Sequence, residues 1–338
     1  MEITARNTNA LARKVYPLIH DVGVQVQTRN GPAIRFDEVT TINLLRPQER
    51  VCFSAARDAN PFFHLVEAMA MLCAHNSVPL MAHYAGNMRN FSDDGKTFNA
   101  FYGTRMHQHN QLLTVIKNLR ANPDSRQELV MLWDIADLTK QTKDKACNIL
   151  MLFEVRDGKL RMVTFNRSND AIWGGVTGAN VVHFSFFQEF VALSLGLQVG
   201  TWSHVSANLH IYLDNPKREN ILQEAIFNLN PQGCGNDYPE SIPLLAPDED
   251  PVGFLEQLCS FFHHHELHLL DPITVSMDDL PDMASPFIQK VLRPMACTWE
   301  SWKVLGERGD RLAHWNWAIE ALDWQDAARM WLSSRGAL

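Results

Sequence analysis

The residue types in this chain that could act as nucleophiles are few and scattered. Six cysteines occur without a Cys-x-x-Cys pair: Cys52, Cys73, Cys147, Cys234, Cys259 and Cys297. A chain of 338 residues can bury a large core without disulfides, so this spacing indicates neither a disulfide framework nor a cysteine metal site. A lone cysteine is usually a small buried side chain. Its neighbours must therefore identify any nucleophile among the six.

Two further segments carry side chains that could do chemistry. Glu67 lies in a largely apolar segment, "NPFFHLVEAMAMLCA" (60–74), with few polar neighbours to define an exposed face, which indicates a buried carboxylate. In "HHHELH" (263–268), His264 and His268 are four residues apart, a helical spacing that can bind Zn²⁺. The string is not His-Glu-x-x-His, so it does not indicate a metalloprotease. We interpret it as a histidine cluster without a metal.

Charge and hydropathy exclude several classes of protein. The chain has 30 Lys and Arg against 38 Asp and Glu, a net charge of −8, which argues against a general nucleic-acid binder. No apolar run reaches the ~18 residues of a membrane span. The N-terminus lacks the apolar core of a signal peptide. We therefore expect a cytoplasmic protein that binds neither nucleic acid nor membrane.

These side chains must be positioned by a mixture of helices and strands. Asn60 can cap a helix that has Pro61 in its first turn, and Asp157-Gly158 predicts the turn of a hairpin. The apolar patterns predict helices at 60–74, 111–123 and 181–197 and strands at 128–135, 147–168 and 207–215.

Four polar segments follow one another in a specific order: "NPDSR" (122–126), "ACN" (146–148), "NRSND" (166–170) and "NLHIY" (208–212). In this order and spacing they resemble the thymidylate synthase family, and the resemblance extends from about Arg29 to Asn215. It implies an α+β fold with a large mixed β-sheet flanked by helices, and a homodimer.

The resemblance also implies a reaction. Adding a thiolate to C6 of a pyrimidine makes C5 nucleophilic toward the one-carbon unit of 5,10-methylenetetrahydrofolate. Cys147 matches the nucleophile, and Arg167 matches a neighbouring arginine that holds the phosphate and favours the thiolate. Glu67 matches a glutamate that relays protons and orders water, and Tyr102 matches a tyrosine near C5.

Further matches imply how the nucleotide and the folate are held. Arg126 matches an arginine donated across the interface of a homodimer, and Gln127 stands where the family usually has a second arginine. The other matches imply phosphate contacts from Arg29 and Ser168, deoxyribose contacts from His210 and Tyr212, and a pterin contact from Asp170.

Asn180 matches the side chain that reads the base. An amide can accept from N3–H of uracil and donate to O4, whereas an aspartate would favour the amino group of cytosine. Asn180 comes ten residues after Asp170 rather than the usual eight, so a small insertion must lie between them. Uracil is therefore the predicted base.

The product depends on whether water or hydride reaches the intermediate. "ACN" places Asn148 where the family usually has a histidine, and "GNMRNFSDDG" (86–95) has Asn87 and Asn90 but no tryptophan. Such polar side chains can position water, and these departures resemble the phage deoxypyrimidine hydroxymethylases. We predict hydroxymethylation of dUMP, in the host cytoplasm for a phage protein. Methylation of dUMP, hydroxymethylation of dCMP or CMP, and an inactive nucleotide-binding relative stay open.

The C-terminal part of the chain differs in composition from the rest. Six of the nine tryptophans lie there: Trp299, Trp302, Trp315, Trp317, Trp324 and Trp331. Their segment is amphipathic, which favours packing on the protein's own core over binding a partner. We predict a catalytic core at 1–222 and a helical C-terminal extension at 223–338 that packs on it.

Overall fold

The computed structural model describes residues 1–227, 233–280, 282–303 and 310–338, which divide into two compact units. The first unit comprises Met1–Ala59, Asn110–Trp133 and Ala146–Tyr238, and the second comprises Asn60–His109, Asp134–Lys145 and Pro239–Leu338. Each unit is thus assembled from three separate stretches of chain.

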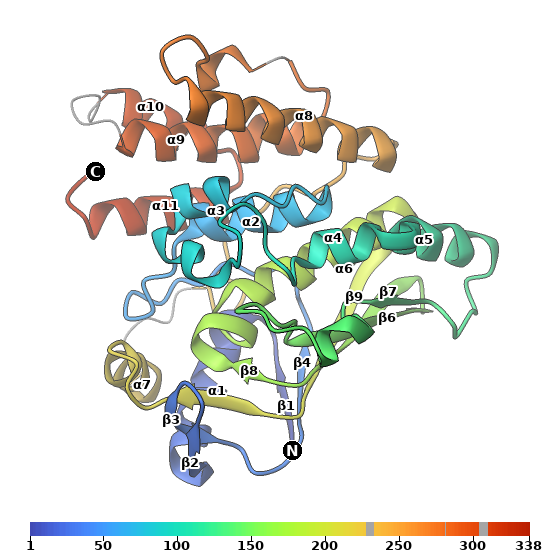
Figure 1. Cartoon of the computed structure of the whole chain (residues 1–338), viewed down its shortest axis with the longest axis vertical. Helices are drawn as coiled ribbons and strands as arrows, with labels where there is room; N and C mark the ends of the chain where they lie inside the picture. Colours follow the sequence, from blue (N-terminus) through green and yellow to red (C-terminus); the bar gives the residue numbers. More distant parts are fainter. Residues whose placement is uncertain (228–232, 281, 304–309) are drawn as a thin grey trace. The chain divides into compact units, whose positions relative to one another are not determined.

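The first unit contains a large mixed sheet, as predicted. Its six strands lie in the order β1 (Glu2–Ala5), β4 (Thr40–Leu44), β9 (Gln198–Ser206), β7 (Lys159–Asn166), β6 (Asn148–Arg156) and β5 (Leu129–Met131). The pairs β1–β4 and β7–β9 are parallel and the other neighbours are antiparallel. Helix α6 (Ala179–Ser194) packs on β7 and β9 (Figure 1). It is apolar nearly all round because it lies in the core.

A smaller sheet completes the first unit. Its four strands lie in the order β2 (Val24–Thr28), β3 (Gly31–Arg35), β10 (Leu209–Tyr212) and β8 (Asn169–Asp170). The α-helices described in this unit besides α6 are α1 (Thr8–Val22), α5 (Gln111–Ala121) and α7 (Arg218–Phe227). Of these, α1 contacts β3 and α7.

Local signals determine several element boundaries. The β6–β7 hairpin turns at Asp157 and Gly158, both with positive φ (51° and 69°), as the Asp-Gly pair predicts. The predicted strand at 128–135 is too long, since β5 ends at Met131. The next residues form a 3₁₀ turn, η3 (Ile135–Leu138), because Asp134 caps it through a hydrogen bond from the N–H of Ala136.

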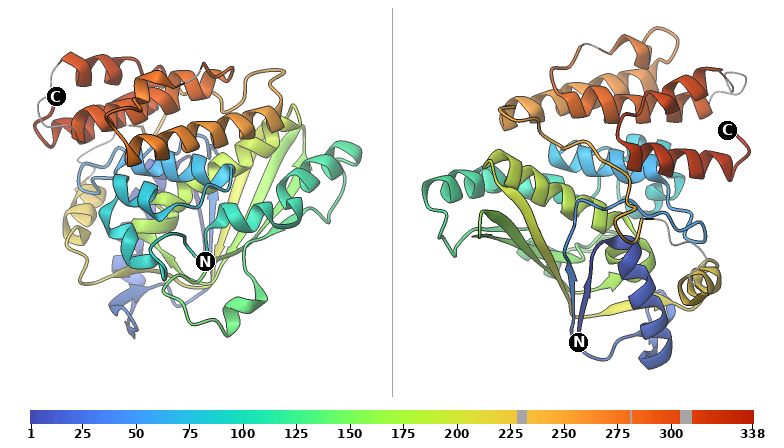
Figure 2. Two further views of the ribbon diagram at one scale, coloured as in Figure 1. Left: turned by 45° about the horizontal axis from the view of Figure 1, so that its top comes forward. Right: turned by 180° about the vertical axis from the view of Figure 1, so that it is seen from behind.

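The second unit is helical and is organised around α2 (Pro61–Leu72), which is buried along nearly its whole length. As predicted, Asn60 caps α2 by accepting from the N–H of Phe63, and Pro61 occupies its first turn. Around α2 lie α3 (Val78–Tyr84), α4 (Tyr102–His107), α8 (Pro251–Leu270), α9 (Arg293–Lys303) and α11 (Leu322–Ser333) (Figure 2). The other described elements of the unit are η1 (Gly86–Phe91), η3, η5 (Met277–Asp279), η6 (Ile288–Leu292) and α10 (Asp310–Trp317), and η2 (Gln108–Asn110) lies at its boundary.

The tryptophan-rich segment packs within this unit. The Phe62 ring of α2 lies 5.6 Å from the rings of both Trp299 and Trp331. Trp324 is also buried, whereas Trp317 is 64% exposed. The C-terminal helices therefore pack on α2, a helix from the stretch 1–222. The division of the chain at residue 222 stays a prediction.

Among the described residues, no helix is both long enough and apolar enough to cross a membrane.

A buried ion pair joins α6 to the segment after β4. Arg50 and Glu189 are 4% and 3% exposed, and the Arg50 guanidinium donates to Glu189 while lying 3.6 Å from the centre of the Phe186 ring. Gln48 donates to the other Glu189 oxygen at 2.9 Å. Removing one partner of such a pair leaves a buried charge without compensation.

We expect Glu189→Ala to lower the free energy of unfolding by about 3–5 kcal/mol, measured by urea denaturation. Glu154→Ala is the control, because Glu154 pairs with Arg156 at the surface and its loss should change little. Equal effects of the two substitutions would contradict this prediction.

His204 is a second buried polar side chain of the first unit. It lies on β9, its ring stacks on Trp202 at 5.3 Å, and neither ring nitrogen has a hydrogen-bond partner among the described residues. Burial lowers the pKa of His204 to about 4. The unfolded chain, with a histidine pKa near ~6.5, therefore binds more protons than the folded chain between these two values.

It follows that His204 destabilises the fold progressively as the pH falls from about 6.5 to about 4, by up to about 3 kcal/mol. His204→Phe should remove this part of the pH dependence of unfolding, while the exposed control His20→Gln should retain it. Parallel pH profiles for wild type and His204→Phe would show that His204 does not titrate in this way.

Candidate active site

Pairing of two strands brings Cys147 and Arg167 together. Cys147 directly precedes β6 and Arg167 directly follows β7, and these antiparallel strands place Asn148 opposite Asn166. The N–H of Arg167 donates to the Cys147 carbonyl at 3.0 Å, and its Nε donates to the Ala146 carbonyl at 2.9 Å. Its Nη2 lies 3.8 Å from Cys147 Sγ. A half-buried thiol beside a guanidinium is a suitable nucleophile, because the positive charge favours the thiolate.

The residue after the thiol is held inside the sheet. Asn148 is fully buried, and its Oδ1 accepts from Nδ2 of Asn166 at 3.0 Å. The β6–β7 register shifts between Asn148 and Leu150, an irregularity of the kind that redirects side chains beside active sites. A polar amide is thus fixed directly behind Cys147.

The short parallel pair β8–β10 aligns further predicted residues. Asp170 lies opposite His210, and the His210 ring lies 5.0 Å from the Tyr212 ring. Ser168, half-buried, is the residue just before β8. Along β10, His210 and Tyr212 lie on one face because side chains alternate.

Arg29 reaches this region through the β2–β3 turn. It is exposed, and the adjacent Asn30 donates from Nδ2 to the hydroxyl of Tyr212 at 3.3 Å. The pairing of Tyr212 with Ala33 keeps the turn against β10. Arg29 is therefore presented at the end of the strand that carries His210 and Tyr212.

A π-helical turn, η4 (Ala171–Gly175), links Asp170 to the helix that carries Asn180. Asp170 Oδ1 accepts from the N–H groups of Ile172 (2.8 Å) and Trp173 (3.1 Å). Burial raises the pKa of Asp170, against the lowering effect of these hydrogen bonds and of His210. This turn occupies half of the ten-residue spacing between Asp170 and Asn180.

Close packing around this turn requires a glycine. A Cβ at Gly178 would lie 1.9 Å from the Trp173 carbonyl group, a distance that no side chain tolerates. A Cβ at Gly174 would lie 3.2 Å from Nδ2 of Asn180. Asn180, half-buried in the first turn of α6, is thus directed partly by the turn that precedes it.

Arg126 lies in the loop between α5 and β5 and is exposed. The loop is held by buried Glu128, which accepts from Ser125 Oγ at 2.7 Å and from Asn118 Nδ2 at 3.0 Å. These hydrogen bonds hold the loop in place, and the Arg126 side chain lies at the surface of the first unit.

Glu67 and Tyr102 belong to the second unit. Glu67 is 6% exposed on α2, which confirms that it is a buried carboxylate, and Tyr102 is 9% exposed at the start of α4. The helices α2 and α4 touch at Gly103, where a Cβ would lie 2.3 Å from the Met71 carbonyl oxygen. The two side chains therefore lie on packed helices.

Three residues near these positions were missed by the sequence analysis. In the first unit, the Arg57 guanidinium donates to the Ile172 carbonyl at 2.8 Å and lies 4.3 Å from the centre of the Trp173 ring, which is 48% exposed. In the second, burial raises the pKa of Asp144, whose Oδ2 accepts from the N–H of Ala100 at 2.7 Å. No local pattern marks Arg57 or Trp173, and the closeness of Asp144 to Cys147 in the sequence was the one available signal.

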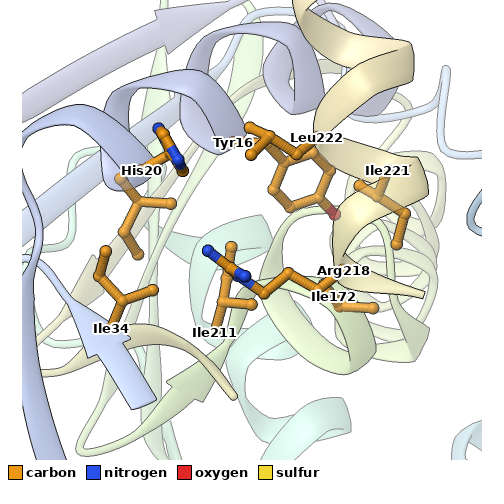
Figure 3. Close-up of a pocket in the computed structure, with 9 residues that line it drawn as sticks. Tyr16, His20, Ile34, Ile172, Ile211, Arg218, Ile221 and Leu222 are labelled. Carbon is orange, nitrogen blue, oxygen red and sulfur yellow. The ribbon is translucent and has the colours of Figure 1, made fainter. Parts of the chain in front are cut away.

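An apolar pocket lies on the other face of β10. Ile211 lines it together with Ile34 and Ile172, and Tyr16 and Arg218 come from α1 and α7 (Figure 3). Since Ile211 alternates with His210 and Tyr212, this pocket is separate from the polar residues described above.

Comparison with known proteins identifies relatives of this chain. The family model described as thymidylate synthase matches residues 74–229. The deoxyuridylate hydroxymethyltransferase of Pseudomonas phage M6 is 36% identical to this chain over 99% of this chain and 96% of its own length. The protein of the same name from Bacillus phage SP01 is 36% identical over 55% of this chain and 52% of its own length.

A solved structure shows the same fold. The thymidylate synthase from T4 phage matches with a TM-score of 0.51 at 20% identity, covering 60% of this chain and 77% of that chain. With the near full-length match to the Pseudomonas phage M6 protein, these similarities show that the chain belongs to the thymidylate synthase family.

Proposed function

We propose that this protein is a dUMP hydroxymethylase, which transfers a one-carbon unit from methylenetetrahydrofolate to C5 of dUMP and adds water to form 5-hydroxymethyl-dUMP. The observation that carries the proposal is the Cys147 thiol, 3.8 Å from the Arg167 guanidinium. It occurs in a chain that is 36% identical, over 99% of its length, to a deoxyuridylate hydroxymethyltransferase. Because the two hydroxymethyltransferases named above are phage proteins, we place the reaction in the host cytoplasm.

The nucleotide would be bound by side chains from several elements of the first unit. Arg29, Arg167 and Ser168 would hold the phosphate, with Arg126 contributed by the second subunit of a homodimer. The exposed position of Arg126 on an anchored loop is consistent with that role. His210 and Tyr212 would hold the deoxyribose hydroxyl, and their register with Asp170 supports a common binding surface.

Asn180 would select the base. Its amide can accept from N3–H and donate to O4 of uracil, and its placement in the first turn of α6 leaves it half-buried, as a base-reading side chain must be. Uracil remains the base that this residue type favours over cytosine.

The thiolate of Cys147 would add to C6, and the pair of electrons so placed on C5 would form the new bond to the one-carbon unit. The bond from this unit to the folate nitrogen would then break, and tetrahydrofolate would leave. The positive charge of Arg167 would favour the thiolate. Glu67 and Tyr102 would then transfer the C5 proton, and Asn148 would help to place the water that becomes the hydroxyl group. Elimination of Cys147 from C6 regenerates the thiolate.

Methylenetetrahydrofolate supplies the one-carbon unit in this scheme. Asp170 suits the pterin, because no described residue donates a hydrogen bond to its Oδ2 and a pterin ring presents N–H donors. Trp173, exposed beside it and stacked on Arg57, offers a flat apolar surface. We also propose that residues 1–222 form the catalytic core that carries all of these side chains.

The product identifies the reaction. Incubated with methylenetetrahydrofolate and dUMP, dCMP or CMP in turn, the protein should convert dUMP to a product heavier by one formaldehyde, with tetrahydrofolate released, as measured by mass spectrometry. A product heavier by one methylene, with dihydrofolate formed, would instead make the protein a thymidylate synthase. Turnover of dCMP or CMP in preference to dUMP would overturn the assignment of Asn180.

The nucleophile is tested by substitution. Cys147→Ala should reduce tritium release from C5-labelled dUMP by at least about 10³-fold, since alanine cannot form the covalent bond at C6. Cys234→Ala is the matched control, because Cys234 is also half-buried in the first unit and should retain full activity. Retention of tritium release by Cys147→Ala would refute the mechanism.

A further inference from the structure

Four side chains from three helices meet in the second unit, and none of them is assigned to catalysis. His83 comes from α3, His265 and His268 come from α8, and Glu300 comes from α9. Glu300 Oε1 lies 2.7 Å from Nε2 of His83 and 3.1 Å from Nε2 of His265. Its other oxygen, Oε2, lies 3.6 Å from Nε2 of His268. One carboxylate thus faces three imidazole nitrogens.

The cluster is buried. His265 is fully buried and Glu300 is 8% exposed. A carboxylate removed from water in this way is usually paired or coordinates a metal ion.

A neighbouring carbonyl orients one of the imidazoles. His268 Nδ1 lies 2.6 Å from the Val275 carbonyl oxygen, which can only accept, so this nitrogen is the one that carries the proton in the neutral ring. Nε2 of His268 is the ring nitrogen that faces Glu300. A hydrogen bond from the remote ring nitrogen to a carbonyl is typical of histidines that bind metals.

We propose that His83, His265 and Glu300 bind a zinc ion, with His268 as the fourth ligand or as the residue that orients Glu300. The ligand atoms of the first three all lie within 4.8 Å of one another. Two ligands about 2.1 Å from one ion are at most ~4.2 Å apart, so binding requires these atoms to approach by some tenths of an ångström. His83 can make that movement, since its side chain is 20% exposed.

The donor set indicates which metal fits. Two or three imidazole nitrogens and one carboxylate are typical of zinc, whereas magnesium and calcium prefer oxygen ligands throughout. The site would cross-link α3, α8 and α9, all in the unit organised around α2, and thereby stabilise this unit without taking part in one-carbon transfer.

This proposal departs from the interpretation of "HHHELH" as a histidine cluster without a metal. The two histidines with the helical spacing were His264 and His268, but Nε2 of His264 lies 2.9 Å from the Ser276 carbonyl oxygen, outside the cluster. His265 takes its place. Residues three apart on a helix lie on the same face, just as residues four apart do. The sequence of α8 alone therefore does not show which histidines meet, because the partners come from α3 and α9.

The test is metal binding by the full-length chain, purified without a histidine tag and stripped with a chelator. Wild type should bind one equivalent of Zn²⁺ by elemental analysis, give the visible absorption of tetrahedral Co²⁺ when Co²⁺ is added instead, and gain several degrees in Tm with either ion. Glu300→Gln and His83→Gln should each lower the affinity at least tenfold. His264→Gln, on the same helix, should bind like wild type.

Two results would overturn the proposal. One is stripped wild type that takes up no stoichiometric Zn²⁺ and shows no change in Tm, which would make the cluster a hydrogen-bonded ion network. The other is metal binding that survives in His83→Gln but is lost in His264→Gln. The wild-type measurement decides the question even if Glu300→Gln does not fold, and none of these readouts depends on enzymatic activity.

Discussion

The antiparallel pairing of β6 with β7 is the constraint on which the candidate active site depends. It brings the start of one strand to the end of the other, so Cys147 and Arg167, far apart along the chain, share backbone hydrogen bonds as well as a side-chain contact. The tight turn at Asp157 and Gly158 sets this register. A slip of one residue would move the thiol to the opposite face of the sheet.

The remaining side chains of the first unit are organised around that pair by short, strongly tied segments. Asp170 and His210 are aligned by a strand pair only two residues long on one side, and η4 and Gly178 then direct the chain into α6. The buried ion pair between Arg50 and Glu189 holds α6 against the segment after β4. The side chains of the candidate site are therefore positioned by polar contacts between short elements in the core.

Local signals made part of this predictable from sequence. The cap and proline of α2 and the hairpin turn depend on neighbouring residues alone, and the order of the four polar segments identified the family. Features set by distant contacts were not predictable in the same way. The strand after Glu128 stops early because Asp134 caps η3. His265 lies in the cluster instead of His264 because of α3 and α9. Arg57 could be recognised only from its contacts with Ile172 and Trp173.

The burial of α2 has a consequence for how the chain can be made. This helix leaves the ribosome early, but α8, α9 and α11, which cover it, come from the last third of the chain. Until these three helices have been synthesised, α2, which has almost no polar face, lacks the helices that cover it in the folded protein. Apolar surface exposed in this way favours aggregation during folding. We therefore expect a chain truncated before α8 to be less soluble, because the apolar surface of α2 would stay exposed.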